Sequence, residues 1–167
     1  DSLSHCIRVY NNKGTLLNLI GEPGDSDGQF NFPVAMAIKE NDLKTGPDYD
    51  ELYVADQGHS HIQIFNLLGT YITSFGSPVE AYSSDWEGKF VKIQSLAFDE
   101  ASNLHANDIY LNKIQILDPD DGDFIDYYGE LGEDAGQLLL PLDHLILNGK
   151  MAVIANTENR RLEIFKR

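Results

Sequence analysis

The chain has 167 residues, of which 42% are hydrophobic and 23% charged, so it is long enough to bury a core and too apolar to be a disordered segment. Its formal net charge of −15 argues against the basic surface that nucleic acids and anionic membranes require, and we expect neither as a partner. Cys6 is the single cysteine, which excludes an internal disulfide and a paired-cysteine metal site, and no apolar run approaches the roughly 18 residues of a membrane span.

One strand pattern recurs four times along the chain. Each copy reads aliphatic, polar, aliphatic, large apolar, and this alternation with period two is typical of a half-buried strand. The copies begin about 50 residues apart, at Ile7–Tyr10, Ile62–Phe65, Ile114–Leu117 and Leu162–Phe165. Self-similarity at such a period indicates a repeat architecture.

The surroundings of these segments repeat as well. After each of the first three, a polar turn with glycine leads into a short strand that ends at another glycine, namely Gly21, Gly76 and Gly129. Before each of the last three lies a strand with a polar exit, at 51–56, 103–108 and 151–156, and further upstream a strand of small apolar residues, at 33–38, 94–99 and 141–147. Four short strands in about 50 residues are the content of one propeller blade.

The second copy closely resembles an NHL repeat. The resemblance is carried by Gly24–Phe30, by Pro33–Ile38, by Leu52–Asp56 and by Ile62–Phe65. The last copy matches well through 136–138 and 159–165, whereas the third lacks the proline and reads Leu104-His105-Ala106 where Tyr-Val-Ala is usual. The resemblance covers essentially the whole chain and implies four-stranded antiparallel blades of a ring with about six blades.

We therefore expect an all-β fold, a partial β-propeller of about three to four NHL-type blades. A partial blade would span 1–21, complete blades 22–76 and 77–129, and a partial blade 130–167. With strands named a to d from the inside outwards, the chain reads c-d, a-b-c-d, a-b-c-d, a-b-c, which cannot close a six-bladed ring alone. Either the chain is a segment of a longer one or two chains complete one ring as a homodimer, and the position of Asp1 inside a repeat motif favours the first.

Two columns of equivalent residues are interpreted as structural. Asp56, Asp108 and Asn156 end equivalent strands, where a short polar side chain bonds the backbone amides of a following turn. A ring of carboxylates for catalysis or metal binding is the alternative. The apolar column Phe30, Phe90 and Leu138 is expected to pack between adjacent blades.

The sequence offers no residue to which a catalytic role can be assigned, and we expect no metal site and no cofactor. His59 and His61 have a spacing that suits a metal, but two ligands do not make a site. NHL-like propellers include a zinc-dependent lyase whose histidines follow the proline of the innermost strand, and Val34 and Leu142 stand there in this chain. Related lactonases use acidic and Asn ligands around the channel, for which Asp143 is one candidate. The enzyme alternative is a lyase-like or lactonase-like site completed by blades outside this chain.

The favoured function is a binding or assembly scaffold that presents propeller-face loops to a protein partner, basic in character or part of a larger assembly. Its loops are those between strands d and a and between strands b and c. The longest, 77–89, carries Tyr82 and Trp86, which are the hot-spot candidates unless Trp86 folds back over a blade edge. His59, His61 and Arg160 complete the candidate partner-binding set. An acidic chain with one cysteine favours an extracellular or periplasmic location.

Overall fold

The protein is described by a computed structural model covering residues 1–41, 44, 46–147 and 151–166. Strands dominate this part of the chain, and its one helical element is a single 3-10 turn, η1 (Ser2–Ser4). No helix within these ranges is both long and apolar enough to cross a membrane. The strands are β1 (Ile7–Tyr10), β2 (Leu16–Ile20), β3 (Pro33–Lys39), β4 (Glu51–Asp56), β5 (His61–Asn66), β6 (Tyr71–Phe75), β7 (Ile93–Phe98), β8 (Leu104–Asp108), β9 (Lys113–Leu117), β10 (Phe124–Tyr128), β11 (Pro141–Leu147), β12 (Met151–Asn156) and β13 (Arg161–Lys166).

The strands form four antiparallel sheets in which chain neighbours are also sheet neighbours. Two sheets have four strands, β3-β4-β5-β6 and β7-β8-β9-β10, while β11-β12-β13 has three and β1-β2 has two. This arrangement confirms an all-β fold with blade-like, four-stranded antiparallel sheets, and the strand count per sheet is the one expected from the repeats. The degenerate third repeat forms its four strands like the second.

Alternation along a central strand divides its side chains between two neighbouring sheets. In β4, Leu52 and Val54 join the apolar cluster shared with β1 and β2, whereas Tyr53 and Ala55 join the cluster shared with β7, β8 and β9. All four are at most 5% exposed. The sheet is thus covered on both faces, which is why its inner strands are apolar at nearly every position.

A contact between a glycine and a large apolar side chain recurs where one sheet ends and the next begins. Gly21, Gly76 and Gly129 have φ values of 77°, 93° and 89°, and a Cβ atom on each would lie within 2.7 Å of side-chain atoms of Phe30, Phe90 or Leu138, respectively. Because only glycine leaves room there, the chain turns tightly and the apolar side chain fills the space. Each member of the apolar column is buried between two adjacent sheets, as predicted.

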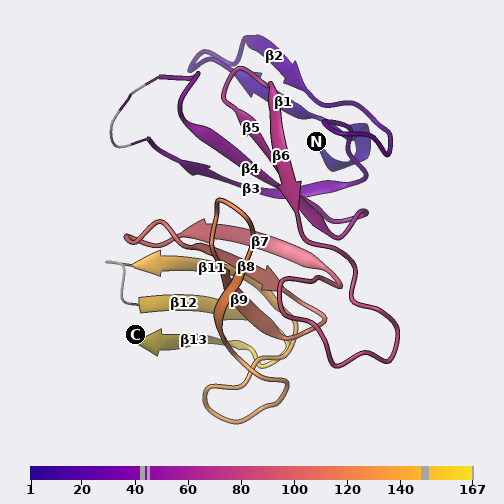
Figure 1. The fold of residues 1–167 in the computed structure, drawn as a ribbon. Coiled ribbons are helices and arrows are strands. Elements are labelled where there is room, and N and C mark those ends of the chain that lie inside the picture. Colours follow the sequence, from indigo (N-terminus) through magenta and orange to yellow (C-terminus); the bar gives the residue numbers. More distant parts are fainter. Residues whose placement is uncertain (42–43, 45, 148–150, 167) are drawn as a thin grey trace.

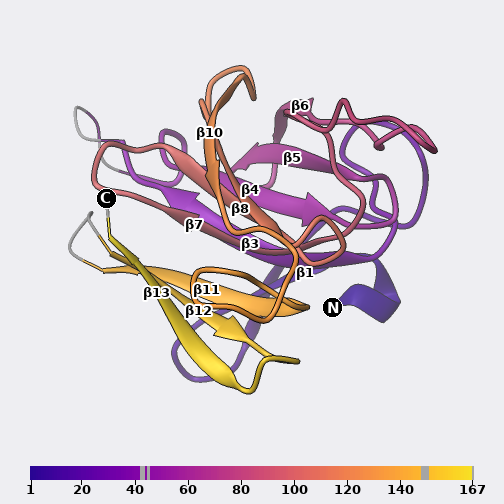
Figure 2. The same ribbon diagram turned by 90° about the horizontal axis from the view of Figure 1, so that it is seen from below.

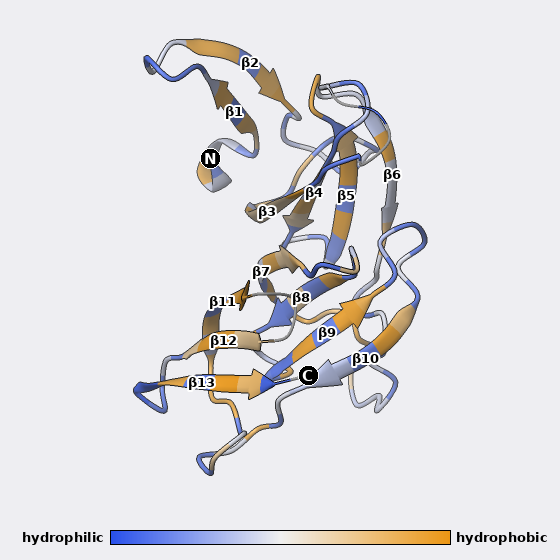
Figure 3. Cartoon of the chain, turned by 90° about the vertical axis from the view of Figure 1, so that its left-hand side faces the viewer, coloured by the Kyte–Doolittle hydropathy of each residue, from blue (hydrophilic) through white to orange (hydrophobic). Residues whose placement is uncertain are grey.

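The sheets follow one another around a common inner side. Strand β7 contacts both β3 and β11, so the first strands of three successive sheets lie side by side. Figure 1 shows the sheets stacked in chain order, and Figure 2 gives the same stack from below. In Figure 3 the outer strands β6 and β10 lie on the far side of their sheets from β3 and β7.

Candidate functional site

Loops from two parts of each repeat meet at one end of the sheets. The turn between β4 and β5 is tied to the loop before β3 by a hydrogen bond from Gly58 N to Asn31 O of 2.7 Å. The equivalent bond in the last repeat runs from Glu158 N to Leu139 O at 3.2 Å, and in the third repeat Ile109 N donates to Lys92 O at 3.1 Å, as Gln57 N does to Phe32 O in the second. The loops that were expected to share a face are therefore joined in each repeat.

The polar column at the strand ends holds these loops in place. Asp56 Oδ1 accepts a hydrogen bond from Asn31 N at 2.9 Å, Asp108 Oδ2 accepts one from Val91 N at 2.6 Å, and Asn156 Oδ1 accepts one from Leu139 N at 2.8 Å. Each side chain is fully buried. This geometry supports the structural interpretation of the column, since a buried backbone N–H needs a partner.

In the second repeat alone, the second carboxylate oxygen of the column residue faces two imidazoles. His59 Nδ1 lies 2.7 Å from Asp56 Oδ2, and His61 Nε2 lies 3.5 Å from the same oxygen. His59 Nε2 lies 3.0 Å from Asp25 Oδ1 in the loop before β3. The two rings are 5.3 Å apart and only 20% and 26% exposed, so neither is a free surface side chain.

In this cluster, the histidine and aspartate side chains shift each other's pKa towards the charged form. Burial alone would lower the pKa of His59, but its hydrogen bonds with Asp25 and Asp56 outweigh burial and raise that pKa above its usual value. Burial alone would raise the pKa of Asp56, yet the neighbouring imidazoles of His61 and His59 and the amide of Asn31 lower it. Asp56 is thus held as an anion beneath two histidines.

Sequence reasoning found the two histidines and missed the acidic groups that complete the cluster. Asp56 was interpreted as a structural residue only, but its Oδ1 binds the backbone while its Oδ2 contacts the His59 ring. A signal was present: the equivalent positions in the last repeat hold Asn159 and Arg161. A change of both residues to histidine in one repeat marks a local departure from the pattern.

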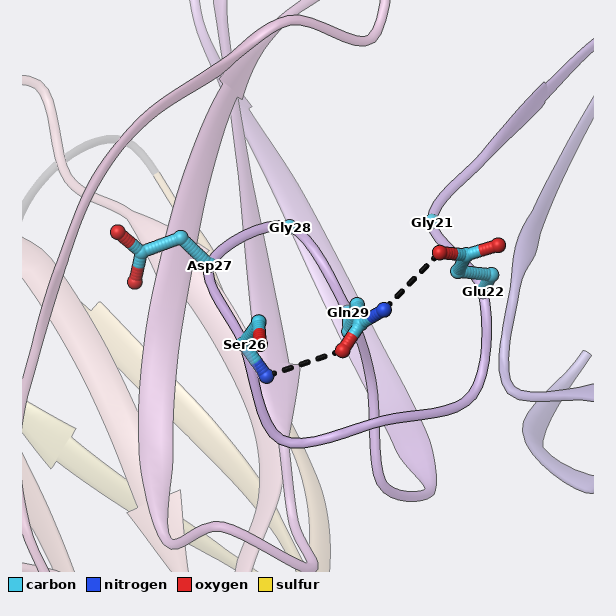
Figure 4. A pocket seen from close by; sticks show the side chains of 6 residues that line it. All are labelled: Gly21, Glu22, Ser26, Asp27, Gly28 and Gln29. Carbon is cyan, nitrogen blue, oxygen red and sulfur yellow. Dashed lines mark hydrogen bonds between the residues drawn. The ribbon is translucent and has the colours of Figure 1, made fainter.

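Beside this cluster, the loop of residues 21–29 encloses a small polar hollow (Figure 4). Gln29 organises the loop, since its Oε1 accepts a hydrogen bond from Ser26 N at 3.1 Å and its Nε2 donates one to Glu22 Oε1 at 2.9 Å. Glu22 and Asp27 line the hollow and are exposed. In Figure 4 the Asp27 carboxylate is directed away from the loop, so the loop presents exposed carboxylates on a backbone that Gln29 fixes.

The two aromatic candidates of the 77–89 loop have different environments. Trp86 packs edge-on against Phe124 and Tyr127 of β10, with ring centroids 5.5 and 5.0 Å apart, and the Lys113 ammonium lies 4.9 Å from its ring centroid. Tyr82 is fully exposed at a positive φ of 65°. Trp86 thus folds back over the blade edge, which was the alternative interpretation, and Tyr82 is the free aromatic side chain of the loop.

Arg160 is a surface residue, whereas its neighbour Arg161 has a structural role. Arg160 is exposed in the turn before β13, whereas Arg161 donates hydrogen bonds to Glu133 O at 2.8 Å and to Glu163 Oε2 at 2.6 Å. The candidate residues are therefore distributed over three repeats: His59 and His61 form one cluster, Tyr82 and Trp86 share the 77–89 loop, and Arg160 lies in the turn before β13.

The inner side of the sheets carries a second, open hollow. Val34, Leu142 and Asp143 line it together with Ser95 of β7. Asp143 Oδ1 accepts a hydrogen bond from His144 N, and Ser95 Oγ lies 2.7 Å from His144 Nδ1. Within the described residues, the one group of three or more His, Cys, Asp or Glu side chains close enough to share a metal is Asp56, His59 and His61, which lies elsewhere.

Comparisons with known proteins inform the fold alone. No family model matches the chain, and no curated protein matches it. Among solved structures, the chain is similar to a structural genomics protein of unknown function from Bacteroides thetaiotaomicron, with a TM-score of 0.55 and 18% identity over 70% of this chain. The chain spans about a third of that structure's length, at 32%. It is thus an all-β chain of blade-like sheets that resembles part of a longer solved structure.

Proposed function

We propose that this chain is a segment of an NHL-type β-propeller and that its loop face is a scaffold for a basic segment of a protein partner. The observation that carries the proposal is the charge of the loops gathered on that face. Residues 22–29, 57–61, 77–89, 111–113, 130–137 and 157–160 contain ten acidic residues and three basic ones. Such a field attracts a cationic partner and repels a nucleic acid.

The three basic residues of this face offset only part of its negative charge. Lys89 pairs with Asp85 at 2.5 Å, and Lys113 is directed over the rings of Trp86 and Tyr127. Glu22 and Asp27 remain exposed beside the hollow of Figure 4, and Glu133 is exposed at the equivalent loop of the last repeat. Lysine or arginine side chains of a partner would find acceptors at two repeats.

The rigidity of the loops favours binding over mere solvation. Two of the loops, 22–29 and 130–137, are each fastened by a glutamine, because Gln29 and Gln137 accept hydrogen bonds from Ser26 N and Asp134 N, at 3.1 and 3.0 Å. A loop fixed by internal bonds loses little conformational entropy on binding. Tyr82, fully exposed on the longest loop, adds an aromatic contact of the kind that anchors protein interfaces.

A titration with a lysine-rich peptide tests the proposal. We expect Glu22→Gln/Asp27→Asn/Glu133→Gln to weaken binding about 10-fold or more, since each lost contact at an interface costs on the order of 0.5 to 1 kcal/mol. The matched control neutralises three acids outside the loop face, Asp48→Asn/Glu100→Gln/Asp121→Asn, and leaves affinity within about 2-fold. Equal losses in both triple variants would show that only net charge matters and would overturn the proposal.

A further inference from the structure

We propose that Asp56, His59 and His61 form a binding site for a divalent transition-metal ion of the zinc class. One oxygen and two nitrogens, each from a different one of these side chains, lie within 4.8 Å of one another. Imidazole nitrogen and carboxylate oxygen are the ligands that zinc takes alongside thiolate. The proposal concerns the metal alone and does not depend on the partner proposed above.

The spacing of the three atoms suits an ion placed between them. With zinc–ligand bonds of about 2.0 to 2.1 Å, the ligand atoms of a tetrahedral site lie roughly 3.3 Å apart. Oδ2 of Asp56 lies 2.7 Å from His59 Nδ1 and 3.5 Å from His61 Nε2, so the observed separations bracket that value. The shorter of these two separations would have to lengthen by about 0.6 Å to reach the tetrahedral value.

An unsatisfied atom gives an independent reason to expect a ligand here. His61 Nε2 is buried and makes no hydrogen bond in the described part of the chain, since its 3.5 Å contact with Asp56 Oδ2 does not have hydrogen-bond geometry. A proton shared by His59 and Asp56 would account for their short contact, but it leaves His61 unexplained. A metal ion uses this nitrogen, and buried polar atoms without partners are costly enough to need such an account.

The hydrogen-bond partners of His59 and Asp56 are also of the kind found around metal ligands. Asp25 Oδ1 lies 3.0 Å from His59 Nε2, so with Nδ1 on the metal the opposite ring nitrogen donates to a carboxylate. Metal-ligating histidines are commonly oriented in this way. Asp56 is fixed in turn, since Oδ1 accepts from Asn31 N and Gln63 Nε2 donates to Oδ2 at 3.2 Å.

The other repeats show what these positions do without a metal. In the last repeat, Asn159 Nδ2 donates to Gly132 O at 2.9 Å and Arg161 donates to Glu133 O and Glu163. In the third, Lys113 lies over Trp86 and Tyr127. Only the second repeat gives up these contacts for two imidazoles. With three protein ligands, a tetrahedral ion keeps one position for water or for a side chain of a partner.

Zinc binding to the purified chain tests the proposal, with Zn²⁺ alone as titrant and Co²⁺ as a spectroscopic probe. The informative variant is His59→Asn/His61→Arg, which installs the residues that the last repeat has at these two positions. We expect one zinc per wild-type chain, at least 100-fold weaker binding in this variant, and about 10-fold weaker binding in Asp25→Asn. His5→Gln, which removes a histidine outside the cluster, is expected to bind like the wild type.

Two readouts keep the test decisive. Zinc should raise the melting temperature of the wild type and not that of His59→Asn/His61→Arg. If that variant fails to fold, His61→Gln removes one ligand and leaves His59 with both of its carboxylates. Absence of stoichiometric zinc in the wild type, or equal affinity in wild type and His61→Gln, would overturn the site and leave the peptide-binding proposal untouched.

Discussion

Equivalent polar pairs satisfy the same backbone groups with different residues. In two repeats an aspartate accepts from the loop, and a glutamine donates to a loop carbonyl, from Gln63 Nε2 to Gln29 O at 2.6 Å and from Gln115 Nε2 to Lys89 O at 2.7 Å. In the last repeat the column residue still accepts from the loop, but it also supplies the donor to the loop carbonyl, and the position of the glutamine holds the acceptor Glu163. Asn156 Nδ2 donates to Gln137 O at 2.7 Å, and Glu163 accepts from Gly136 N at 2.8 Å.

This exchange predicts a strongly coupled pair of substitutions. Asn156→Asp alone removes the donor to Gln137 O and places a second carboxylate beside Glu163, so we expect a loss of about 2 kcal/mol in the free energy of unfolding. Asn156→Asp/Glu163→Gln restores the arrangement of the other repeats and should recover most of that loss. Denaturant unfolding of the two single variants and the double variant measures the coupling, and purely additive effects would contradict it.

His144 makes the stability of the protein sensitive to acid. It occupies the place of Met36 in an earlier repeat and is 6% exposed, between Ser95 and the ring of His105. Burial, followed by the charge of His105, lowers the pKa of His144 to about 3. The folded state therefore holds this ring neutral at pH values where the unfolded chain protonates it.

The sign of the pH effect follows from that difference. Below the unfolded pKa of about 6.5 the unfolded chain binds the extra proton, so stability falls as the pH falls towards the folded pKa. At about 1.4 kcal/mol per unit, we expect a contribution of about 2 kcal/mol between pH 7 and pH 5. His144→Met should remove that part of the slope. The measurement is the free energy of unfolding at pH 7 and at pH 5. An equal loss between these pH values in the wild type and in His144→Met would contradict the assignment.

The loop of residues 77–89 is an ordered cover for the outer strand β10. Trp86 rests on Phe124 and Tyr127, and Lys89 pairs with Asp85 within the loop. We expect Trp86→Ala to lower the free energy of unfolding by about 2 kcal/mol, because aromatic pairs add to the area buried. Tyr82→Ala is the matched control and should change stability by less than about 0.5 kcal/mol. Thermal unfolding distinguishes them, and equal effects would mean that the loop is not held by Trp86.

The strands were predictable and the long loop was not, for a physical reason. Period-two alternation and the apolar column locate β3 and β11 at or within a residue of the ends expected, and even the degenerate β8 follows the pattern. These features report which face of a strand is buried. The position of Trp86 depends on side chains from β9 and β10, and the Asp56 cluster depends on a side chain with two separate partners. Neither follows from local alternation.

Taken as a whole, the stack of sheets leaves the outer face of the β11-β12-β13 sheet without the cover that the internal sheets have. Ile62 and Ile64 of β5 are 0% and 1% exposed, because the next sheet packs on them. Their equivalents in β13, Leu162 and Ile164, are 68% and 56% exposed. Leu145 of β11 lies on the same sheet, in register with Val153 and through it with Ile164. Contiguous apolar surface of this kind promotes association.

The chain studied alone should therefore self-associate through this face. We expect its sedimentation coefficient to rise with concentration, and Leu162→Lys/Ile164→Lys to abolish the rise, because charged side chains on an edge strand disfavour pairing and burial. Leu68→Lys, which changes an exposed leucine in the turn between β5 and β6, is the control and should sediment like the wild type. Since the substituted side chains make up an exposed row, circular dichroism should show unchanged strand content. A wild-type chain that stays monomeric over the whole concentration range would mean that the apolar row of β13 is too small to drive assembly.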